Sequence, residues 1–200
     1  MIEHPKARVA VLISGGGTNL QAILDKEQAG ELPHAEIALV VSSSEKAYGL
    51  VRAEKAGVEA VTIRGKDFEE RLIALLEERE IDLIVLAGFL KILSADFVRR
   101  YPKRILNVHP SLIPSFCGDG FYGLHVHEAA LEYGVKVTGA TVHFVNEVTD
   151  GGEIIAQKAV AVEEGDTPEV LQQRVMKEAE HILLPQAVED VARDIVERRA

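Results

Sequence analysis

The chain has 200 residues, a formal net charge of −10, a hydrophobic fraction of 47% and one cysteine, Cys117. One cysteine excludes an internal disulfide and a cysteine-based zinc site, and no apolar run reaches the roughly 18 residues of a membrane-spanning helix. The acidic balance argues against a nucleic-acid-coating surface, and residues 1–8 lack the architecture of a signal peptide, so we expect no nucleic-acid or membrane partner.

Short β-rich apolar runs alternate with longer segments of helical period through the first half of the chain. In chain order we expect strand 8–13, helix 18–28, strand 36–41, helix 47–55, strand 58–63, helix 68–79, strand 83–87, helix 94–101 and strand 104–108. The helix at 68–79 is strongly amphipathic because Leu72, Leu75 and Leu76 share one face. This alternation predicts a parallel sheet covered by helices on both faces.

The second half of the chain has a different pattern. We expect a loop at 110–123, a helix at 125–132, antiparallel strands at 137–145 and 154–162, and a helical segment at 167–198. Pro168 suits the first turn of that segment, either Asp166 or Thr167 caps it, and Pro185 predicts a kink or break. We therefore expect one domain, 1–200, of the α/β class. Its doubly wound, mostly parallel Rossmann-like sheet has an antiparallel C-terminal extension and a long C-terminal helix.

Three glycines followed by Thr18 and Asn19 connect the first strand to the first helix. Glycines let backbone amides approach a ligand, and the helix N-terminus adds a positive dipole end, so a phosphate is the expected ligand; a plain tight turn is the alternative. A dinucleotide fingerprint fails because Leu20 occupies its third glycine position. The net charge of −10 describes the whole surface and does not exclude a phosphate, because a phosphate is held by a few backbone amides at one helix end. The candidate phosphate-binding residues are Gly16, Gly17, Thr18 and Asn19.

Asn107 and His109 end the strand expected at 104–108 and, being two residues apart, share one face. They emerge at the carboxyl end of the strand, where open α/β sheets bind their ligands. An amide donor beside an imidazole suits a carbonyl that becomes an oxyanion, and histidine can move a proton at neutral pH. The alternative is a structural pair whose polar atoms are satisfied within the fold.

Asp150 precedes two glycines in the turn expected between the last two strands. Aspartate is common in turns because it accepts hydrogen bonds from the following amides. The alternative places Asp150 beside His109, where a carboxylate would orient the imidazole and stabilise its charged form. The sequence leaves both interpretations open. We interpret His143, inside an apolar strand, as structural rather than as a ligand.

Four segments together resemble the phosphoribosylglycinamide formyltransferases, a folate-dependent family of purine synthesis. They are VLISGGGTNLQAI (11–23), VLAGFLKIL (85–93), ILNVHPSLIPSF (105–116) and VTGATVHFVNEVTDGGEIIAQ (137–157), and the similarity runs from Val9 to about Val191. Between Pro114 and His127 the chain is longer than the shortest members of the family. The resemblance therefore does not determine the shape of this loop, which forms the rim of the expected active site and contains Cys117.

The resemblance implies a role for each matching residue. Asn107, His109 and Asp150 match the catalytic residues, the glycine loop matches the phosphate site, and Glu180 matches an acidic residue that contacts the glycinamide. The folate-contacting positions are matched by Leu90, Lys91, Ile92, Leu93, Asn107, Asn146, Glu147, Val148, Thr149 and Asp150, with either Arg64 or Lys66 as a basic contact. Separately, the spacing of histidines and carboxylates does not indicate a metal site, so we expect no metal.

The implied reaction transfers the formyl group of 10-formyltetrahydrofolate, the co-substrate, to the amine of glycinamide ribonucleotide. The expected partners are these small molecules, and we expect a cytoplasmic monomer or homodimer. Three alternatives are a formyltetrahydrofolate hydrolase, a methionyl-tRNA formyltransferase and a non-catalytic phosphosugar-binding module. The first two usually carry a further domain, for which we expect no room, and the third leaves Asn107, His109 and Asp150 unexplained.

Overall fold

Within residues 6–199, which the computed structural model describes, seven strands form one sheet in the order β3-β2-β1-β4-β5-β6-β7. The strands are β1 (Ala7–Ile13), β2 (Ala35–Ser42), β3 (Glu59–Thr62), β4 (Leu83–Leu86), β5 (Ile105–His109), β6 (Val137–Phe144) and β7 (Ile154–Ala161). β1 to β5 pair in parallel, whereas β6 pairs antiparallel with both β5 and β7. The predicted sheet is confirmed. Residues 1–5, part of the segment expected to lack a signal peptide, lie outside the described residues.

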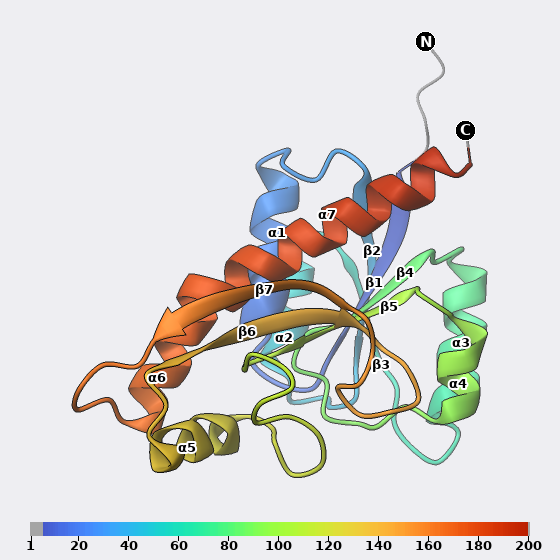
Figure 1. Cartoon of the computed structure of the whole chain (residues 1–200). Helices are drawn as coiled ribbons and strands as arrows, with labels where there is room; N and C mark the ends of the chain where they lie inside the picture. The colour runs from blue at the N-terminus through green and yellow to red at the C-terminus, as the bar shows by residue number, and fades with distance from the viewer. Residues whose placement is uncertain (1–5, 200) are drawn as a thin grey trace.

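Helices cover both faces of the parallel strands, as a doubly wound fold requires (Figure 1). They are α1 (Thr18–Gln28), α2 (Tyr48–Lys55), α3 (Phe68–Glu78), α4 (Ala95–Arg100), α5 (Leu124–Tyr133), α6 (Pro168–Val175), the π-helix η1 (Met176–Glu180) and α7 (His181–Glu197). Successive side chains of β1 enter opposite cores. Val9 and Val11 pack with α1, α2 and α7, whereas Ala10 and Leu12 pack with α3 and α4. Burial on both faces explains why β1 is an unbroken apolar run.

The helical segment at the C-terminus begins at a side-chain cap. The Thr167 hydroxyl accepts a hydrogen bond from the Val170 backbone N–H at 3.4 Å, so Thr167 is the residue that caps α6. Asp166 instead binds Arg174, with a carboxylate oxygen 2.7 Å from the guanidinium. The structure thus resolves which of the two candidates is the N-cap.

The same segment does not break where the sequence predicted. Pro185 lies inside α7, so the helix does not break at this residue, and the alternative, a kink, stays a prediction. Proline offers no N–H to the carbonyl four residues earlier, which here belongs to His181. The irregular turn lies just before α7, in η1, where the helix widens and then continues.

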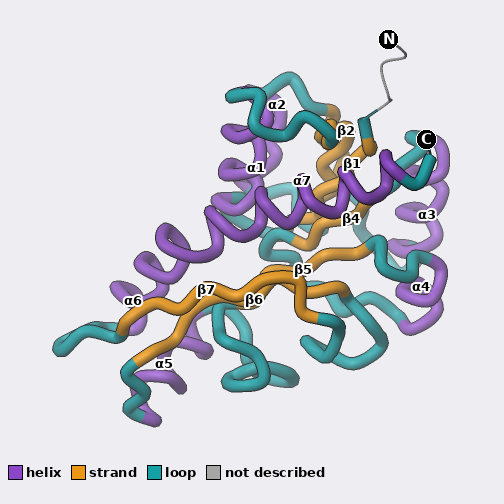
Figure 2. The backbone as a smooth tube through the Cα atoms, turned by 45° about the horizontal axis from the view of Figure 1, so that its top comes forward, coloured by secondary structure: helices purple, strands orange, loops and turns teal. Residues whose placement is uncertain are grey.

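The order of the strands reverses at β1 and thereby positions the site. The chain moves outward from β1 to β2 and β3, then returns to β4 on the other side of β1. Figure 2 shows β1 between β2 and β4. Such a switch point opens a crevice at the carboxyl ends of the flanking strands. β5 and β6 extend this edge, with Asn107 paired opposite His143 and His109 opposite Thr141.

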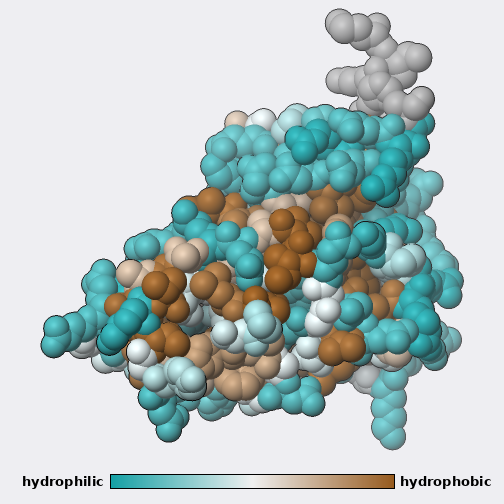
Figure 3. All heavy atoms as spheres, in the orientation of Figure 1, coloured by the Kyte–Doolittle hydropathy of each residue, from teal (hydrophilic) through white to brown (hydrophobic). Residues whose placement is uncertain are grey.

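The surface carries scattered apolar residues. Val137 at the start of β6 and Ile154 at the start of β7 are 52% and 43% exposed. Figure 3 shows hydrophobic surface distributed over the face on which β6, β7 and α7 lie. In the described part of the chain, no helix has the length and apolar character needed to cross a membrane.

Candidate active site

A cleft of about 940 Å³ lies where the carboxyl ends of β1, β4 and β5 meet. Most of the residues expected at a site line its walls. They are Gly16, Gly17, Thr18, Asn19, Leu90, Lys91, Ile92, Leu93, Asn107, His109, Asn146, Glu147, Val148, Thr149, Asp150 and Glu180. The fold thus brings together five segments that are far apart in the sequence.

Arg64 and Lys66 are not among the residues that line the cleft. Both follow β3, and the Arg64 guanidinium lies 3.2 Å from a carboxylate oxygen of Glu45 in an exposed pair. The expectation that one of the two basic residues contacts the co-substrate therefore gains no support from their positions and stays a prediction.

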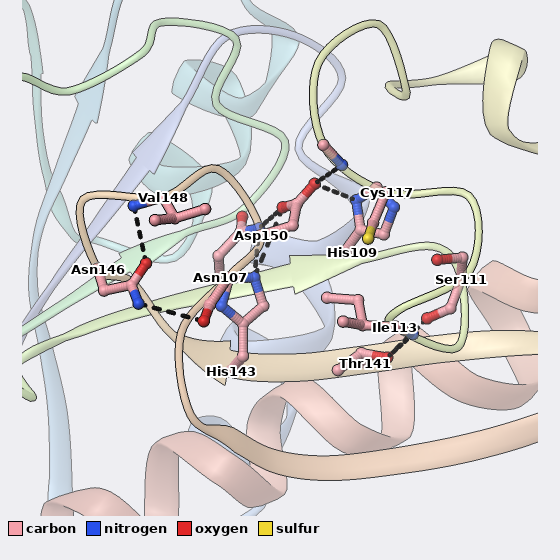
Figure 4. A network of polar contacts seen from close by, with 12 residues as sticks. Asn107, His109, Ser111, Ile113, Cys117, Thr141, His143, Asn146, Val148 and Asp150 are labelled. Atoms are coloured by element: carbon pink, nitrogen blue, oxygen red, sulfur yellow. Dashed lines mark hydrogen bonds and ion pairs between the residues drawn. The ribbon is translucent and has the colours of Figure 1, made fainter.

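His109 reaches the cleft from the end of β5, and its side chain is only 5% exposed. Its Nε2 lies 2.8 Å from the carbonyl oxygen of Phe116. Its Nδ1 lies 3.5 Å from Oδ2 of Asp150 (Figure 4). The Phe116 carbonyl can only accept, so Nε2 carries the proton of this hydrogen bond, whereas the Nδ1 contact is an ion pair only when that nitrogen is also protonated. His109 is thus positioned to donate a hydrogen bond from Nε2.

Asp150 lies beside His109 although 40 residues of sequence separate them. Its Oδ2 accepts a hydrogen bond from the Gly118 N–H at 2.9 Å, and its Oδ1 lies 3.6 Å from Nε2 of His143. Burial alone would raise the pKa of Asp150, but the contacts with His143, Gly118 and His109 outweigh burial and lower it. Asp150 is therefore ionised at neutral pH.

His143 lines the cleft, and its interpretation as a structural residue rather than a ligand stays a prediction. Its Nδ1 lies 2.9 Å from the carbonyl oxygen of Phe144, which can only accept a hydrogen bond. Its Nε2 lies 3.2 Å from the Asn107 amide nitrogen and 3.6 Å from Oδ1 of Asp150. His143 therefore contacts two residues of the candidate site. The signal for these contacts is the pairing of β5 with β6, which sequence periodicity does not reveal.

The glycine loop presents free backbone N–H groups to the cleft at the start of α1. Gly17 occupies the N-cap position with a φ of 71°, in the left-handed region that glycine tolerates. The Arg52 Nε donates a hydrogen bond to the Gly16 carbonyl at 2.8 Å and fixes the loop from outside. The first-turn N–H groups and the helix dipole make this loop an anion-binding site.

Glu180 meets the glycine loop from η1 and is 6% exposed. The Asn19 amide donates a hydrogen bond to its Oε2 at 2.7 Å, and the Thr18 hydroxyl lies 3.2 Å from the sulfur of Met176. Burial raises the pKa of Glu180, and the Asn19 hydrogen bond only partly opposes this shift. The widened turn of η1 brings Met176 and Glu180 to the wall of the cleft. Such π-helical turns are frequent at functional sites.

Glu180→Gln is expected to change how stability depends on pH. Because the pKa of Glu180 is raised, its proton stabilises the folded state fully below the ordinary value of 4.5 and progressively less as pH rises through the raised value. Glutamine does not titrate, so the stability of Glu180→Gln relative to wild type should increase from about pH 4 to about pH 8. Urea unfolding at both pH values measures this change.

Glu178→Gln, an exposed substitution in the same π segment, is the control for the pH experiment. Its free energy of unfolding should follow that of the wild type across the whole range. A difference between Glu180→Gln and wild type that stays constant with pH would contradict the raised pKa.

Backbone groups in the loop before α5 complete the site, and the sequence analysis did not identify them. The Phe116 carbonyl contacts His109 and the Gly118 N–H contacts Asp150. Phe116 and Gly118 have φ values of 49° and 88°, so a left-handed backbone aims both groups. The glycine- and proline-rich composition of 110–123 was the available signal, because such composition marks loops with unusual backbone geometry.

Known proteins are similar in sequence to this chain over most of its length. Residues 7–188 match the formyl transferase family. A phosphoribosylglycinamide formyltransferase from Haemophilus influenzae is 42% identical over 89% of this chain and 84% of its own length. The human trifunctional purine biosynthetic protein adenosine-3 is 46% identical over 98% of this chain, which spans 19% of that relative's length.

Solved structures share the fold at high similarity. Glycinamide ribonucleotide transformylase 1 from Symbiobacterium toebii superposes with a TM-score of 0.87 at 44% identity, covering 94% of this chain and 89% of that one. Phosphoribosylglycinamide formyltransferase from Brucella melitensis gives 0.84 at 44% identity, covering 94% and 96%. These likenesses include the antiparallel C-terminal strands, because they extend over nearly the whole chain.

Proposed function

Because the chain belongs to the formyl transferase family, we propose that it transfers the formyl group of 10-formyltetrahydrofolate to the amine of glycinamide ribonucleotide, in de novo purine synthesis. The observation that carries the proposal is the convergence of Asn107, His109 and Asp150 in one cleft with the glycine loop. The products are the N-formyl ribonucleotide and tetrahydrofolate. No metal takes part in the proposed reaction.

The glycine loop is the proposed site of the substrate phosphate. Gly16, Gly17, Thr18 and Asn19 bring backbone N–H groups and two polar side chains to the start of α1. Glu180 is close enough to the loop to hydrogen-bond Asn19, so a ribonucleotide whose phosphate lies on the loop would present its glycinamide near Glu180. A buried carboxyl group suits the amine end of that substrate.

The opposite part of the cleft is the proposed folate site. Leu90, Ile92 and Val148 line the cleft and are 70%, 84% and 64% exposed. Large apolar side chains that are this exposed in a concave wall favour a ligand with a flat apolar ring system. The neighbouring backbone of 146–150 supplies polar groups that would fix its orientation.

In the proposed reaction the substrate amine attacks the formyl carbon, and the formyl oxygen becomes an oxyanion. The Asn107 amide and the imidazolium of His109 donate hydrogen bonds to this oxygen, each such donor stabilising the transition state by about 3 kcal/mol. The His109 Nε2–H faces the Phe116 carbonyl at 2.8 Å, so it exchanges this acceptor for the oxyanion. Binding both substrates in one cleft also removes much of the entropic barrier, up to ~7–11 kcal/mol.

In the proposed transfer, Asp150 carries one proton from the attacking amine to the leaving folate nitrogen. Its ionised carboxylate keeps His109 charged and accepts the proton that the attacking amine loses. That proton passes to the folate nitrogen as its bond to the formyl carbon breaks. Formyl transfer is direct in this scheme, without a covalent formyl-enzyme.

One assay tests the proposal against its alternatives. The purified chain is supplied with 10-formyltetrahydrofolate, with and without glycinamide ribonucleotide, and formation of tetrahydrofolate is followed. We expect turnover only when the ribonucleotide is present. Turnover without the ribonucleotide would identify a hydrolase, and absence of turnover under both conditions would favour a phosphosugar-binding module.

A further inference from the structure

His127 is a second histidine in the wall of the cleft, and the proposed reaction does not use it. It lies in the first half of α5, its side chain is 0% exposed, and it lines the same cleft as His109. Neither of its ring nitrogens has a hydrogen-bond partner among residues 6–199. Nearly all buried polar groups in folded proteins are hydrogen-bonded, so these two nitrogens indicate a partner outside the chain.

The protonation state of His127 restricts the chemistry of that partner. Burial, assisted by the charge of nearby His109, lowers the pKa of His127 to about 4. The ring is therefore neutral at physiological pH and offers one N–H donor and one nitrogen acceptor. A hydroxyl or an amide can both accept from and donate to this ring, whereas a phosphate or carboxylate oxygen only accepts and would leave the second nitrogen unpaired.

The position of α5 indicates which substrate supplies the partner. α5 packs against α6, which continues into η1, and Figure 1 shows α5 and α6 at the end of the molecule away from α3 and α4. Gln172, Met176 and Glu180 bring α6 and η1 to the cleft, and Glu180 hydrogen-bonds Asn19 of the glycine loop. His127 thus belongs to the wall that faces the proposed nucleotide site, not the apolar wall around Leu90 and Ile92.

We propose that His127 is a further substrate-binding residue, whose neutral ring hydrogen-bonds a hydroxyl or amide group of the phosphoribosyl substrate. The inference rests on the proposed function, because it assigns a contact within the same cleft. In this proposal His127 binds an uncharged polar group of the substrate, while the glycine loop binds its phosphate.

The test replaces His127 with phenylalanine, which removes both ring nitrogens and keeps an aromatic ring. We expect the KM for the ribonucleotide to rise about 10- to 100-fold, because one or two hydrogen bonds to a buried group are lost. The KM for 10-formyltetrahydrofolate should stay within about twofold of its wild-type value. The melting temperature should not fall, because phenylalanine removes unpaired polar atoms from a buried position.

Matched variants separate a binding role from a structural one. His127→Asn and His127→Gln each return a donor and an acceptor close to one ring nitrogen, and we expect one of them to recover part of the lost affinity. His125→Phe is the control, because His125 lies on the same helix with an exposed side chain and does not line the cleft. It should leave both KM values unchanged.

Ribose 5-phosphate, used as a competitive inhibitor, distinguishes the two possible partner groups. If His127 binds a ribosyl hydroxyl, inhibition weakens in His127→Phe as well; if it binds the glycinamide amide, only the full substrate is affected. A wild-type KM for the ribonucleotide in His127→Phe would overturn this inference alone. Failure of the wild-type chain to use the ribonucleotide would overturn the proposed function and this inference with it.

Discussion

Replacing Asp150 with asparagine is expected to lower kcat by about 10²- to 10⁴-fold, the usual contribution of a positioned acid–base group. Asparagine keeps the shape of the side chain and an oxygen that can accept from the Gly118 N–H, which lies 2.9 Å from Asp150. It removes the negative charge beside His109 and the acceptor for the amine proton. Steady-state rates with both substrates saturating measure the effect.

The same variant has an expected signature in stability. The pKa of Asp150 is lowered in the folded state, so its ionised form stabilises the fold above the ordinary aspartate value of 3.8, and this contribution is lost as pH falls through the lowered value. Asp150→Asn should therefore be less stable than wild type at neutral pH, with a difference that shrinks in acid. Urea unfolding at about pH 7 and about pH 3 separates this effect from the loss of turnover.

Two further variants make the Asp150 result specific. Asp190→Asn changes an aspartate on the exposed side of α7, outside the cleft, and should retain wild-type kcat. The double variant His109→Ala, Asp150→Asn should be hardly slower than the slower single variant, because residues that act as one unit are strongly non-additive. Near-normal turnover in Asp150→Asn, or additive losses in the double variant, would contradict the proposed proton path.

The parts of the site that sequence alone located are those with a local signal. Asn107 and His109 were found because they are two residues apart at the end of an apolar strand, and the glycine loop because it joins a strand to a helix. Their common position follows from the parallel sheet, since carboxyl ends of parallel strands lie on one edge. Local pattern was sufficient wherever a single element carries the chemistry.

Contacts between distant segments were beyond the sequence pattern. Asp150 had two interpretations because only the folded chain shows that the turn after β6 lies over His109, and strand register decides that His143 contacts Asn107. His127 also falls in an apolar helical pattern that gives no hint of two unpartnered nitrogens. In each case tertiary packing, rather than residue type, assigns the role.

Gly17→Ala is expected to lower kcat/KM for the ribonucleotide by roughly 10²-fold, the effect of displacing a binding loop by about 1 Å. Gly17 has a φ of 71°, and a Cβ added there would lie 2.7 Å from the Cα of Gly49, in contact with backbone that cannot rotate away. Gly49 is itself held against the loop, because its backbone N–H donates a hydrogen bond to the Gly15 carbonyl at 3.1 Å. The loop must therefore shift, and with it the N–H groups at the start of α1.

Gly15→Ala is the matched substitution for stability, because Gly15 does not have a positive φ and a Cβ there meets nothing within 4 Å. We expect Gly17→Ala to lose about 1–3 kcal/mol of unfolding free energy, the cost of holding an alanine in the left-handed region, and Gly15→Ala to lose almost none. The KM for 10-formyltetrahydrofolate serves as an internal control and should change little in Gly17→Ala. Because the proposed phosphate contact depends on the backbone geometry of this loop, an equally stable Gly17→Ala with unchanged affinity for the ribonucleotide would remove the glycine loop from the proposed site.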